Sequence, residues 1–527
     1  MYTLWYGGKI YTMEKEEETV EAVLVKDDKI IATGFYEDLA NSAEKHCNLH
    51  GAVMYPGFVD SHLHIMSQGE KLVRLDLSEA TSSQVMLEMI KEAAKVTPPD
   101  QWLVGEGWNE NNFVDKKIPT IEELNEIRKE PILLTRVCRH SILVNSSAIE
   151  ASGITIESES PSGGEIGRDN NGELSGLFYE QAMDLITDTL PKEGETYITY
   201  LKKVLNLAID QMLSYGLTGG HTDDMHSFGE FMNPFTAYRD VIGEKEHFKV
   251  NLLRRHTVFD KMINKKLPYQ ASFLEEGAMK LFLDGSLGSS TAALKAPYSD
   301  NEKNKGLFVH TDEEVTEMVK LARENDAAVA IHVIGDAAAE QAIRIIEKHP
   351  VKPGKRDRLI HCSILREDLI DRIVDLPVVI DVQPAFVTSD FPWIVNKIGK
   401  ERLNYTYAWK TLLESGIYCA AGTDAPIESI DPLETIYAAI ERKNQHSTES
   451  YTPEQKISRF KAIQMYTLGS AQAICKEHER GLIKQNYEAD FTVFDRDLFE
   501  GTSEDLLNAN VVKTIVAGKT VFEKNHQ

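Results

Sequence analysis

Tyr55-Pro-Gly-Phe-Val-Asp-Ser-His-Leu-His64 is the stretch of this chain that decides its fold. A short apolar run, Ala52 to Met54, comes directly before it and indicates a buried strand. Residues two apart on a strand point to the same side, so the imidazoles of His62 and His64 are expected to project together. Two neighbouring imidazoles can bind one metal ion through nitrogen. Two surface histidines would have the same spacing, so the surrounding sequence has to decide between these interpretations.

The middle of the chain alternates apolar runs with helical patterns such as Glu313–Asn325 and Ala337–Lys348. Alternating strands and helices predict a parallel sheet, closed or open. Ten runs exceed the eight strands of a (β/α)8 barrel, so at least two are expected in an insertion at about residues 100–175. The Gly- and Ser-rich segment Ser158–Gly176 is typical of a loop or lid. The ten runs are Ala52–Asp60, Trp102–Gly107, Ile132–Val137, Leu217–Thr222, Val250–Arg254, Ala278–Leu283, Ala328–His332, Leu359–Cys362, Val378–Val382 and Tyr418–Ala421.

Both ends of the chain carry the pattern of short strands. Near the start, Ala22–Val25 and Ile30–Thr33 flank a charged turn and predict a hairpin. Near the end, a strand over Asp490–Phe494 precedes a second hairpin around Ala517-Gly518. We therefore predict one small β domain built from residues 1–55 and 481–527, around a barrel domain of residues 56–480.

Composition and charge narrow the classes of function. The chain has 57 basic and 83 acidic residues and a net charge of −26, which argues against nucleic acid or an anionic membrane as partner. No apolar run approaches the roughly 18 residues that span a bilayer, and the first residues lack the basic and apolar regions of a signal peptide. Five cysteines without a CxxC pair fit a reducing compartment. A cytoplasmic protein is expected, and a homo-oligomer is left open.

Several predicted strands carry or end at a residue that can bind a metal ion. Lys280 lies inside one apolar run, and His332, His361 and Asp424 follow others. In a barrel, groups at the C-terminal ends of the strands converge on one mouth, where such enzymes build their sites. Each residue alone has an ordinary explanation: a hydrogen-bonded core histidine, an ion-paired lysine or a helix-capping aspartate. Their joint occurrence favours a site.

The order His-x-His, Lys, His, His, Asp resembles the amidohydrolase superfamily. Further motifs resemble its amidohydrolase family 3 branch and, within it, the YtcJ-like proteins, relatives of N-substituted formamide deformylase. The resemblance covers essentially the whole chain, with the block from Asp284 to Tyr298 as its most specific part. Thr423 stands where the family more often has serine. The motifs are Gly105-x-Gly-Trp108, Pro119-Thr120, Pro131 to Arg136, His140, Val144-Asn-Ser146, Gly163-Gly164, Asp284 to Ser289, Thr291-Ala292, Pro297-Tyr298 and Gly422 to Pro426.

This resemblance implies an α/β fold, a TIM-like (β/α)8 metal-dependent hydrolase barrel with a composite β-sandwich domain from both termini. It also implies one or two divalent metal ions, and the histidine-rich donor set favours zinc. The implied ligands are His62, His64 and Asp424 for a first ion, His332 and His361 for a second, and Lys280 as a bridge after carboxylation by CO₂.

The implied reaction is hydrolysis of a carbon–nitrogen bond other than a peptide bond. Metal-activated hydroxide attacks the carbonyl of an amide, formamide or cyclic amide, and Asp424 carries the proton to the leaving nitrogen. The expected partner is therefore a small amide-like substrate, whose identity the sequence does not give. Two alternatives stay open: a heterocycle deaminase of the same superfamily, and a non-catalytic scaffold that retains the fold. Lys280 weighs against the deaminase, because some deaminases of the superfamily lack the bridging lysine. The complete set of six ligands weighs against the scaffold.

Six further residues are expected to bind substrate or to orient a ligand imidazole. Each also has a structural explanation, which is polar bonding for five of them and core packing for the tryptophan. The insertion at about residues 100–175 is expected to cover the metal mouth and to influence substrate choice. The six are Trp108, Arg136, His140, His221, Asp223 and Asp284.

Overall fold

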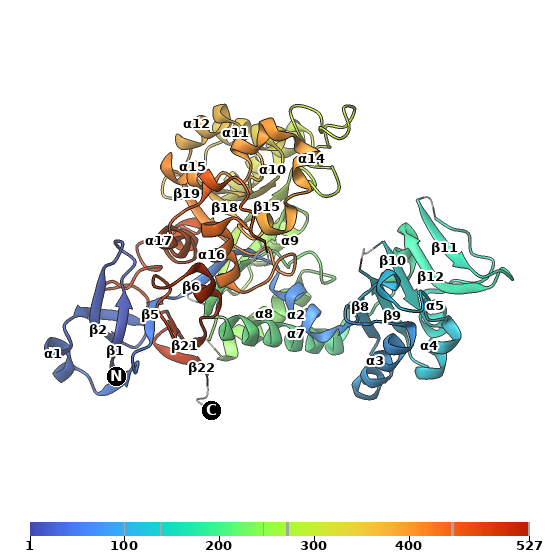
Figure 1. Ribbon diagram of the computed structural model, residues 1–527, viewed down its shortest axis with the longest axis horizontal. Helices are drawn as coiled ribbons and strands as arrows, with labels where there is room; N and C mark the ends of the chain where they lie inside the picture. Colours follow the sequence, from blue (N-terminus) through green and yellow to red (C-terminus); the bar gives the residue numbers. More distant parts are fainter. Residues whose placement is uncertain are drawn as a thin grey trace. The chain divides into compact units, whose positions relative to one another are not determined.

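The computed structural model describes residues 1–524 apart from 100, 138–139, 162, 246, 270–272 and 444–446. The chain divides into two compact units, one made of Met1–Ser67 together with the chain from Ile198 onward, the other of Gln68–Tyr197. Figure 1 labels their helices and strands. Within the described residues, no helix is both long enough and apolar enough to cross a membrane.

Eight parallel strands form the barrel of the larger unit, with every neighbouring pair parallel. Both faces of these strands are covered, which is why they read as continuous apolar runs rather than alternating ones. The predicted α/β fold with a TIM-like barrel is confirmed. In sheet order the strands are β6 (Phe58–Leu63), β13 (Leu217–Thr222), β14 (Lys249–Arg255), β15 (Leu274–Phe282), β16 (Val329–Val333), β17 (Asp357–His361), β18 (Val378–Val382) and β19 (Tyr418–Ala421).

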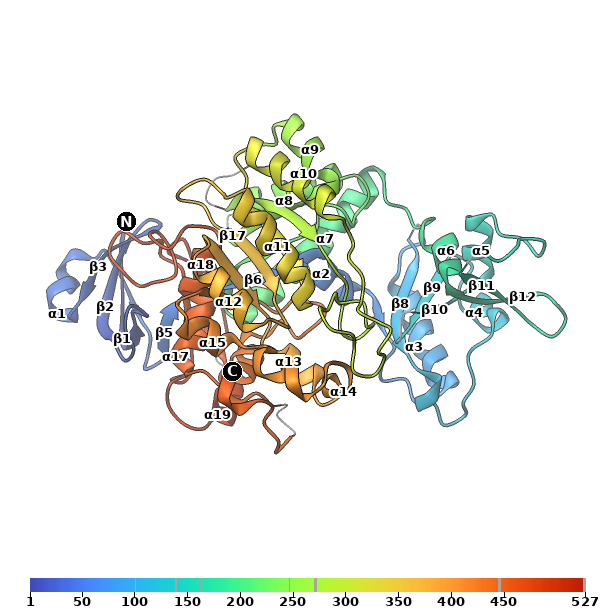
Figure 2. The same ribbon diagram turned by 90° about the horizontal axis from the view of Figure 1, so that it is seen from above.

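Helices between the strands cover the outside of this barrel, as α10, α11 and α12 do beside β17 in Figure 2. Their apolar faces follow the helical period: in α11, Ala338, Ala342 and Ile345 are all buried. Helix α10 begins at a capping box in which Thr311 and Glu314 exchange hydrogen bonds. The helices are α8 (Met232–Lys245), α9 (His256–Lys265), α10 (Asp312–Glu324), α11 (Asp336–Lys348), α12 (Glu367–Val374), α13 (Phe386–Asp390), α14 (Ile394–Ile398), α15 (Trp409–Glu414), α16 (Pro432–Glu441), α17 (Arg459–Gln464) and α18 (Ser470–Ala473).

The barrel closes between β6 and the chain that follows β19. Asp60 accepts hydrogen bonds from the backbone N–H of Thr423 at 3.1 Å and from its hydroxyl at 2.6 Å, and both residues are buried. Close approach at this seam requires glycine at position 422, where a Cβ atom would lie 2.5 Å from the backbone nitrogen of His62. The seam therefore fixes the loop after β19 against the histidines of β6.

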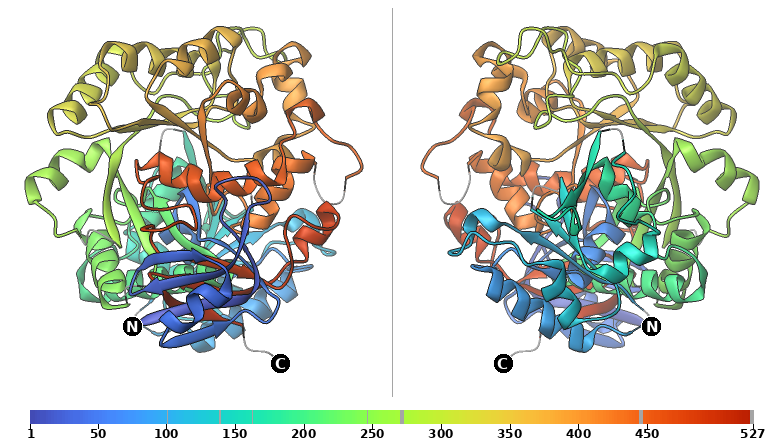
Figure 3. Two further views of the ribbon diagram at one scale, coloured as in Figure 1. Left: turned by 90° about the vertical axis from the view of Figure 1, so that its left-hand side faces the viewer. Right: turned by 90° about the vertical axis from the view of Figure 1, so that its right-hand side faces the viewer.

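A second eight-stranded sheet combines the two ends of the chain, in the order β22-β21-β20-β5-β1-β2-β3, with β4 paired to β1. Figure 3 shows the first strands, in dark blue, beside the last, in dark red. The link between the ends is the antiparallel pair of β5 with β20. The elements are β1 (Tyr2–Tyr11), β2 (Thr19–Lys26), β3 (Lys29–Gly34), α1 (Tyr36–Leu39), β4 (Lys45–Asn48), β5 (Val53–Pro56), β20 (Phe491–Phe494), α19 (Ser503–Leu507), β21 (Val511–Val516) and β22 (Lys519–Glu523).

The run Ala52–Asp60, predicted as one strand, is two strands in two different sheets. The first, β5, ends at Pro56, and the second, β6, begins at Phe58. The proline has no N–H to continue the ladder, and Gly57 packs so closely that a Cβ atom there would lie 2.5 Å from the hydroxyl of Thr218. Pro56-Gly57 is therefore the point where the chain leaves the terminal sheet and enters the barrel.

The smaller unit has a six-stranded sheet in the order β11-β12-β10-β9-β8-β7. Two of the ten predicted runs form its strands β8 and β9. The unit extends over Gln68–Tyr197, which is longer at both ends than the predicted insertion at about residues 100–175. The elements are β7 (Leu75–Asp76), α3 (Ser83–Val96), β8 (Leu103–Trp108), α4 (Ile121–Ile127), β9 (Ile132–Arg136), β10 (Ser141–Val144), α5 (Ser146–Ser152), β11 (Gly164–Arg168), β12 (Leu174–Glu180) and α6 (Asp184–Thr187); α2 (Ile65–Val73) and α7 (Gly194–Ser214) connect in sequence to the larger unit.

Thr423→Val tests the seam, because valine keeps the shape of threonine but leaves the buried Asp60 carboxylate without its hydroxyl donor. We expect a loss of about 1–3 kcal/mol in the free energy of unfolding, the cost of one unmade buried hydrogen bond. The matched control, Thr423→Ser, keeps the donor. Differential scanning calorimetry of the two variants should give a lower Tm for the valine variant, and equal melting temperatures would contradict the seam's importance.

Candidate functional site

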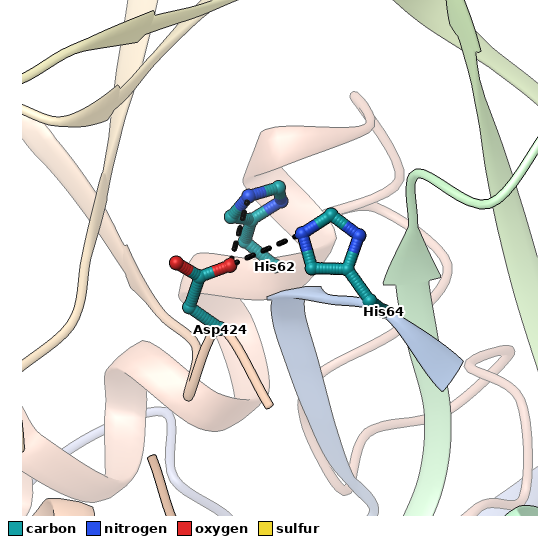
Figure 4. Close-up of side chains that lie close together, drawn as sticks. All are labelled: His62, His64 and Asp424. Carbon is teal, nitrogen blue, oxygen red and sulfur yellow. Dashed lines mark ion pairs between the residues drawn. The ribbon is translucent and has the colours of Figure 1, made fainter. Parts of the chain in front are cut away.

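Two histidines and one aspartate meet where the barrel closes (Figure 4). His62 lies near the end of β6, His64 directly follows it, and Asp424 follows the seam residue Thr423. The backbone N–H of Asp424 donates to the carbonyl of His62 at 2.8 Å, and that of His64 donates to Ala425 at 2.8 Å. Asp424 has a φ of +55°, a conformation uncommon for residues other than glycine. The backbone thus turns the carboxylate toward both imidazoles.

The three side chains have the spacing of a metal site. Asp424 Oδ1 lies 3.5 Å from His62 Nε2 and 3.3 Å from His64 Nε2. Among the described residues, one ligand atom from each of these three side chains lies within 4.8 Å of the other two. Two nitrogen lone pairs and one anionic oxygen directed at one point suit a borderline divalent metal such as zinc.

Lys280 lies beside this group and comes from the carboxyl-terminal part of a barrel strand. It belongs to β15, is fully buried, and its Nζ atom is 3.1 Å from His62 Nε2. The same nitrogen lies 4.8 Å from the centre of the Phe282 ring. The structure therefore brings the predicted lysine next to the first histidine, at a distance typical of a hydrogen bond.

His332 and His361, from the neighbouring strands β16 and β17, continue the cluster. Their ring centres are 4.6 Å apart, and that of His361 is 5.7 Å from that of His62. His361 also has a positive φ, of +76°, at the end of its strand. All six residues predicted as ligands are thus neighbours at the carboxyl ends of strands of one barrel.

Hydrogen bonds fix which nitrogen of three imidazoles carries the lone pair. Each ring donates from one nitrogen to a protein oxygen, which leaves its other nitrogen as an electron-pair donor, the usual arrangement around a metal. Gln383 is itself oriented, because its Nε2 donates to the carbonyl of Asp381 at 3.2 Å. The acceptors are the backbone oxygen of Asp223 for His64 Nδ1 (3.1 Å), the backbone oxygen of Gly285 for His332 Nε2 (3.1 Å) and Oε1 of Gln383 for His361 Nδ1 (2.7 Å).

Burial sets the protonation of the cluster. It lowers the pKa of His62 well below its ordinary value and that of His361 to about 4, so both rings are neutral at pH 7. Burial also lowers the pKa of Lys280 to about 8. For His64, burial lowers the pKa, but the hydrogen bond and charge of Asp424 outweigh it and raise the value to about 9. Neutral imidazoles such as those of His62 and His361 can bind a metal ion directly, and an amine that loses its proton easily can react with CO₂. His64 has to release its proton before it can bind an ion.

Three of the predicted substrate or orienting residues belong to the barrel. Asp223 touches the cluster through its backbone oxygen, while its carboxylate pairs with Arg255 at 3.1 Å. Asp284 accepts three backbone N–H bonds, one at 2.9 Å from Ala293, and its Oδ1 lies 3.7 Å from His332 Nε2. Both are placed to hold ligand imidazoles, a role that stays a prediction.

His221, the third of these, points elsewhere. It lines a cavity together with Thr218, Lys249 and Glu275, which lie at the amino-terminal ends of β13, β14 and β15. Among the described residues, no hydrogen bond, ion pair or ring contact joins His221 to the six predicted ligands. His221 lies near the end of the predicted strand Leu217–Thr222, and this position alone does not determine which end of the barrel its imidazole faces.

The other three predicted residues belong to the smaller unit. Trp108 is buried in a hydrophobic cluster, and its Nε1 donates to the carbonyl of Leu134 at 3.3 Å, so core packing accounts for it. Arg136 forms two bonds to the carboxylate of Glu110, at 2.8 and 2.9 Å. His140 is exposed and pairs with Glu180 at 3.0 Å. Their contribution to substrate binding stays a prediction.

Sequence reasoning missed three residues that contact the cluster or its supports. Asp60 holds the seam, Gln383 orients His361, and Arg255 pairs with Asp223. The position of each residue in the sequence could have indicated it. Asp60 lies two residues before the first histidine, and Gln383 and Arg255 directly follow predicted strands. Their polar side chains at the barrel mouth were the available signal.

Comparison with known proteins identifies the family of this chain. The model of the amidohydrolase family matches residues 45–522. Putative amidohydrolase YtcJ of Bacillus subtilis is 43% identical over the full length of both chains, and N-substituted formamide deformylase of Arthrobacter pascens is 24% identical over 98% of each. An uncharacterized metal-dependent hydrolase of Pyrococcus furiosus superimposes with a TM-score of 0.81 at 27% identity, over 95% of this chain and all of that one. The chain therefore belongs to the amidohydrolase family.

Proposed function

We propose that this protein is a metal-dependent amidohydrolase that cleaves the C–N bond of an amide, a formamide or a cyclic amide. The observation that carries the proposal is the convergence of His62, His64, Asp424 and Lys280 at one mouth of the barrel. The full-length similarity to an N-substituted formamide deformylase supports the C–N bond as the target. A heterocycle deaminase would act on the same kind of site, and no contact in the site favours it.

His62, His64 and Asp424 would hold a first ion, and His332 and His361 a second. When bound, a divalent ion of this kind would lower the pKa of water to near 7 and polarise a carbonyl group. The protein's own part is to keep the imidazoles of His62, His332 and His361 neutral and to orient the rings. Burial does the first, and the bonds from His64, His332 and His361 to protein oxygens do the second.

Lys280 has the properties that carbamate formation needs. The ammonium first loses a proton to solvent, and the neutral amine then adds to the carbon of CO₂. Loss of a second proton from that nitrogen completes the change from a buried cation to a carbamate anion with two oxygens. Burial favours the neutral amine that starts this reaction, since the pKa is already lowered to about 8. The carbamate would then lie next to His62 and supply two oxygen ligands.

We propose that Asp424 moves the proton. Its Oδ1 faces His62 and His64, which leaves Oδ2 to accept the proton of the attacking water. The same oxygen then delivers that proton to the departing nitrogen, so the amine leaves neutral. Burial raises the pKa of Asp424, but the hydrogen bond and charge of His64 and the charge of Lys280 outweigh it and hold the pKa below its usual value, so Asp424 is ionised when the cycle begins.

The first test of the proposed function measures metal content. Purified protein should contain at least about one divalent ion per chain by elemental analysis, most readily zinc. His62→Ala and His64→Ala should lose it, while the control His46→Ala, which changes an exposed histidine on β4, should retain it. Wild-type protein that stays well below one ion per chain after incubation with metal would contradict the site.

The second prediction concerns Lys280. Lys280→Ala should lower metal content, and a short carboxylic acid with added metal should restore part of it by occupying the space of the carbamate. Isotopically labelled bicarbonate should give a carbamate signal by NMR in the wild type but not in the variant. The exposed control Lys303→Ala should change neither result. A wild-type spectrum without that signal would rule out carboxylation.

The third prediction separates metal binding from proton transfer. Asp424→Asn keeps the size and one ligand oxygen of the side chain but cannot accept the proton. We expect kcat to fall about 100- to 10,000-fold, the range for loss of a general acid–base group, while metal content falls much less. A near-normal kcat with full metal content would remove Asp424 from the proton-transfer role.

A further inference from the structure

Arg255 is a cation of the barrel mouth with no part in the mechanism above. It is the last residue of β14 and pairs in register with Lys280 on β15. Strand ends of this kind form the surface that a barrel enzyme presents to its substrate. The side chain keeps 20% of its surface exposed, whereas that of the neighbouring Lys280 is fully buried.

The guanidinium of Arg255 is held in a fixed plane. Its Nη1 donates to Asp223 Oδ2 at 3.1 Å, and its Cζ lies 3.7 Å from the centre of the Phe282 ring. Phe282 in turn stacks on His332, with ring centres 4.8 Å apart and an angle of 23°. One aromatic ring therefore contacts both the arginine and a predicted metal ligand, which puts the cation next to the reacting centre.

Most hydrogen-bonding capacity of this guanidinium is unused within the described residues. Of its five N–H groups, the bond to Asp223 engages one. Buried arginines elsewhere in the barrel are bound on more sides: Arg358 bonds to Asp381 and to the Ser61 carbonyl, and Arg254 bonds to the Gly277 carbonyl and to Glu276. Arg255 alone among these three combines spare donors with exposure at the mouth.

A planar, oriented fork with spare N–H groups suits a carboxylate, which accepts two parallel hydrogen bonds from it. Phe282 covers one face of the guanidinium, so a ligand has to approach its edge, where the N–H groups point. We propose that Arg255 binds a carboxylate of the substrate, so that the preferred substrates are N-formyl or N-acyl amino acids or cyclic amides bearing a carboxylate. This inference rests on the proposed amidohydrolase activity and adds the substrate class to it.

The test uses a matched pair of substrates, an N-formyl amino acid and its primary carboxamide, with metal-loaded enzyme. Wild type should have the higher kcat/KM for the acid. Arg255→Gln should lower kcat/KM for the acid about 10- to 100-fold and leave the carboxamide nearly unchanged, the effect of one charge-assisted pair. Arg255→Lys should give an intermediate loss. The control Arg372→Gln, a charge removed from the outer surface of α12, should leave both values unchanged.

Arg255→Gln leaves the buried carboxylate of Asp223 without its partner and can fail to fold. The double variant Arg255→Gln/Asp223→Asn removes both charges and should show the same selective loss, with metal content equal to wild type. Equal losses on both substrates, or a wild-type preference for the carboxamide, would overturn the carboxylate site while leaving amide hydrolysis intact. Metal-loaded wild type that hydrolyses neither compound, nor any other formamide or amide, would overturn the proposed function itself.

Discussion

The hydrogen bonds between Asp60 and Thr423 are the constraint on which the site depends. They close the barrel, and in doing so they bring the loop after β19 against the end of β6. Asp424 and His62 are each within two residues of a seam residue, so a displaced seam would separate the carboxylate from both imidazoles. Gly422 permits this contact, since any larger residue would collide with the backbone of His62. The same contacts therefore close the barrel and position the residues of the site.

The site also concentrates groups that are costly to bury. Two histidines, a lysine and an aspartate lie together with little access to water, and His361 and Asp424 adopt positive φ angles. Each such feature costs stability, which the surrounding packed strands have to supply. A bound divalent ion offsets part of the cost, because it pairs with lone pairs and negative charge that otherwise face one another. We infer that the apo protein is less stable than the metal-bound one.

The sequence predicted the parts of this arrangement that are local. Apolar runs gave the barrel strands, and the strand-end histidines, Lys280 and Asp424 appeared as one pattern. It could not predict the contacts that depend on register between strands, such as Gln383 with His361 or Arg255 beside Lys280. It also did not show that His221 lines a cavity with Thr218 and Lys249, because a residue near the end of a run can face either end of the barrel interior. Sequence periodicity predicts which face of a strand a side chain lies on, but the residues that it contacts depend on how the strands pack.

A carboxylate-bearing substrate has to be reconciled with a net charge of −26. The charges that matter are those within about one Debye length, near 8 Å at physiological ionic strength, because more distant surface charges are screened. At the mouth, Arg255 pairs with Asp223 at 3.1 Å, and His64 pairs with Asp424 at 3.3 Å. A divalent ion held by His62, His64 and Asp424 would add positive charge at this mouth. Because distant surface charges are screened, this added charge together with Arg255 would attract a carboxylate at short range despite the net negative charge of the protein.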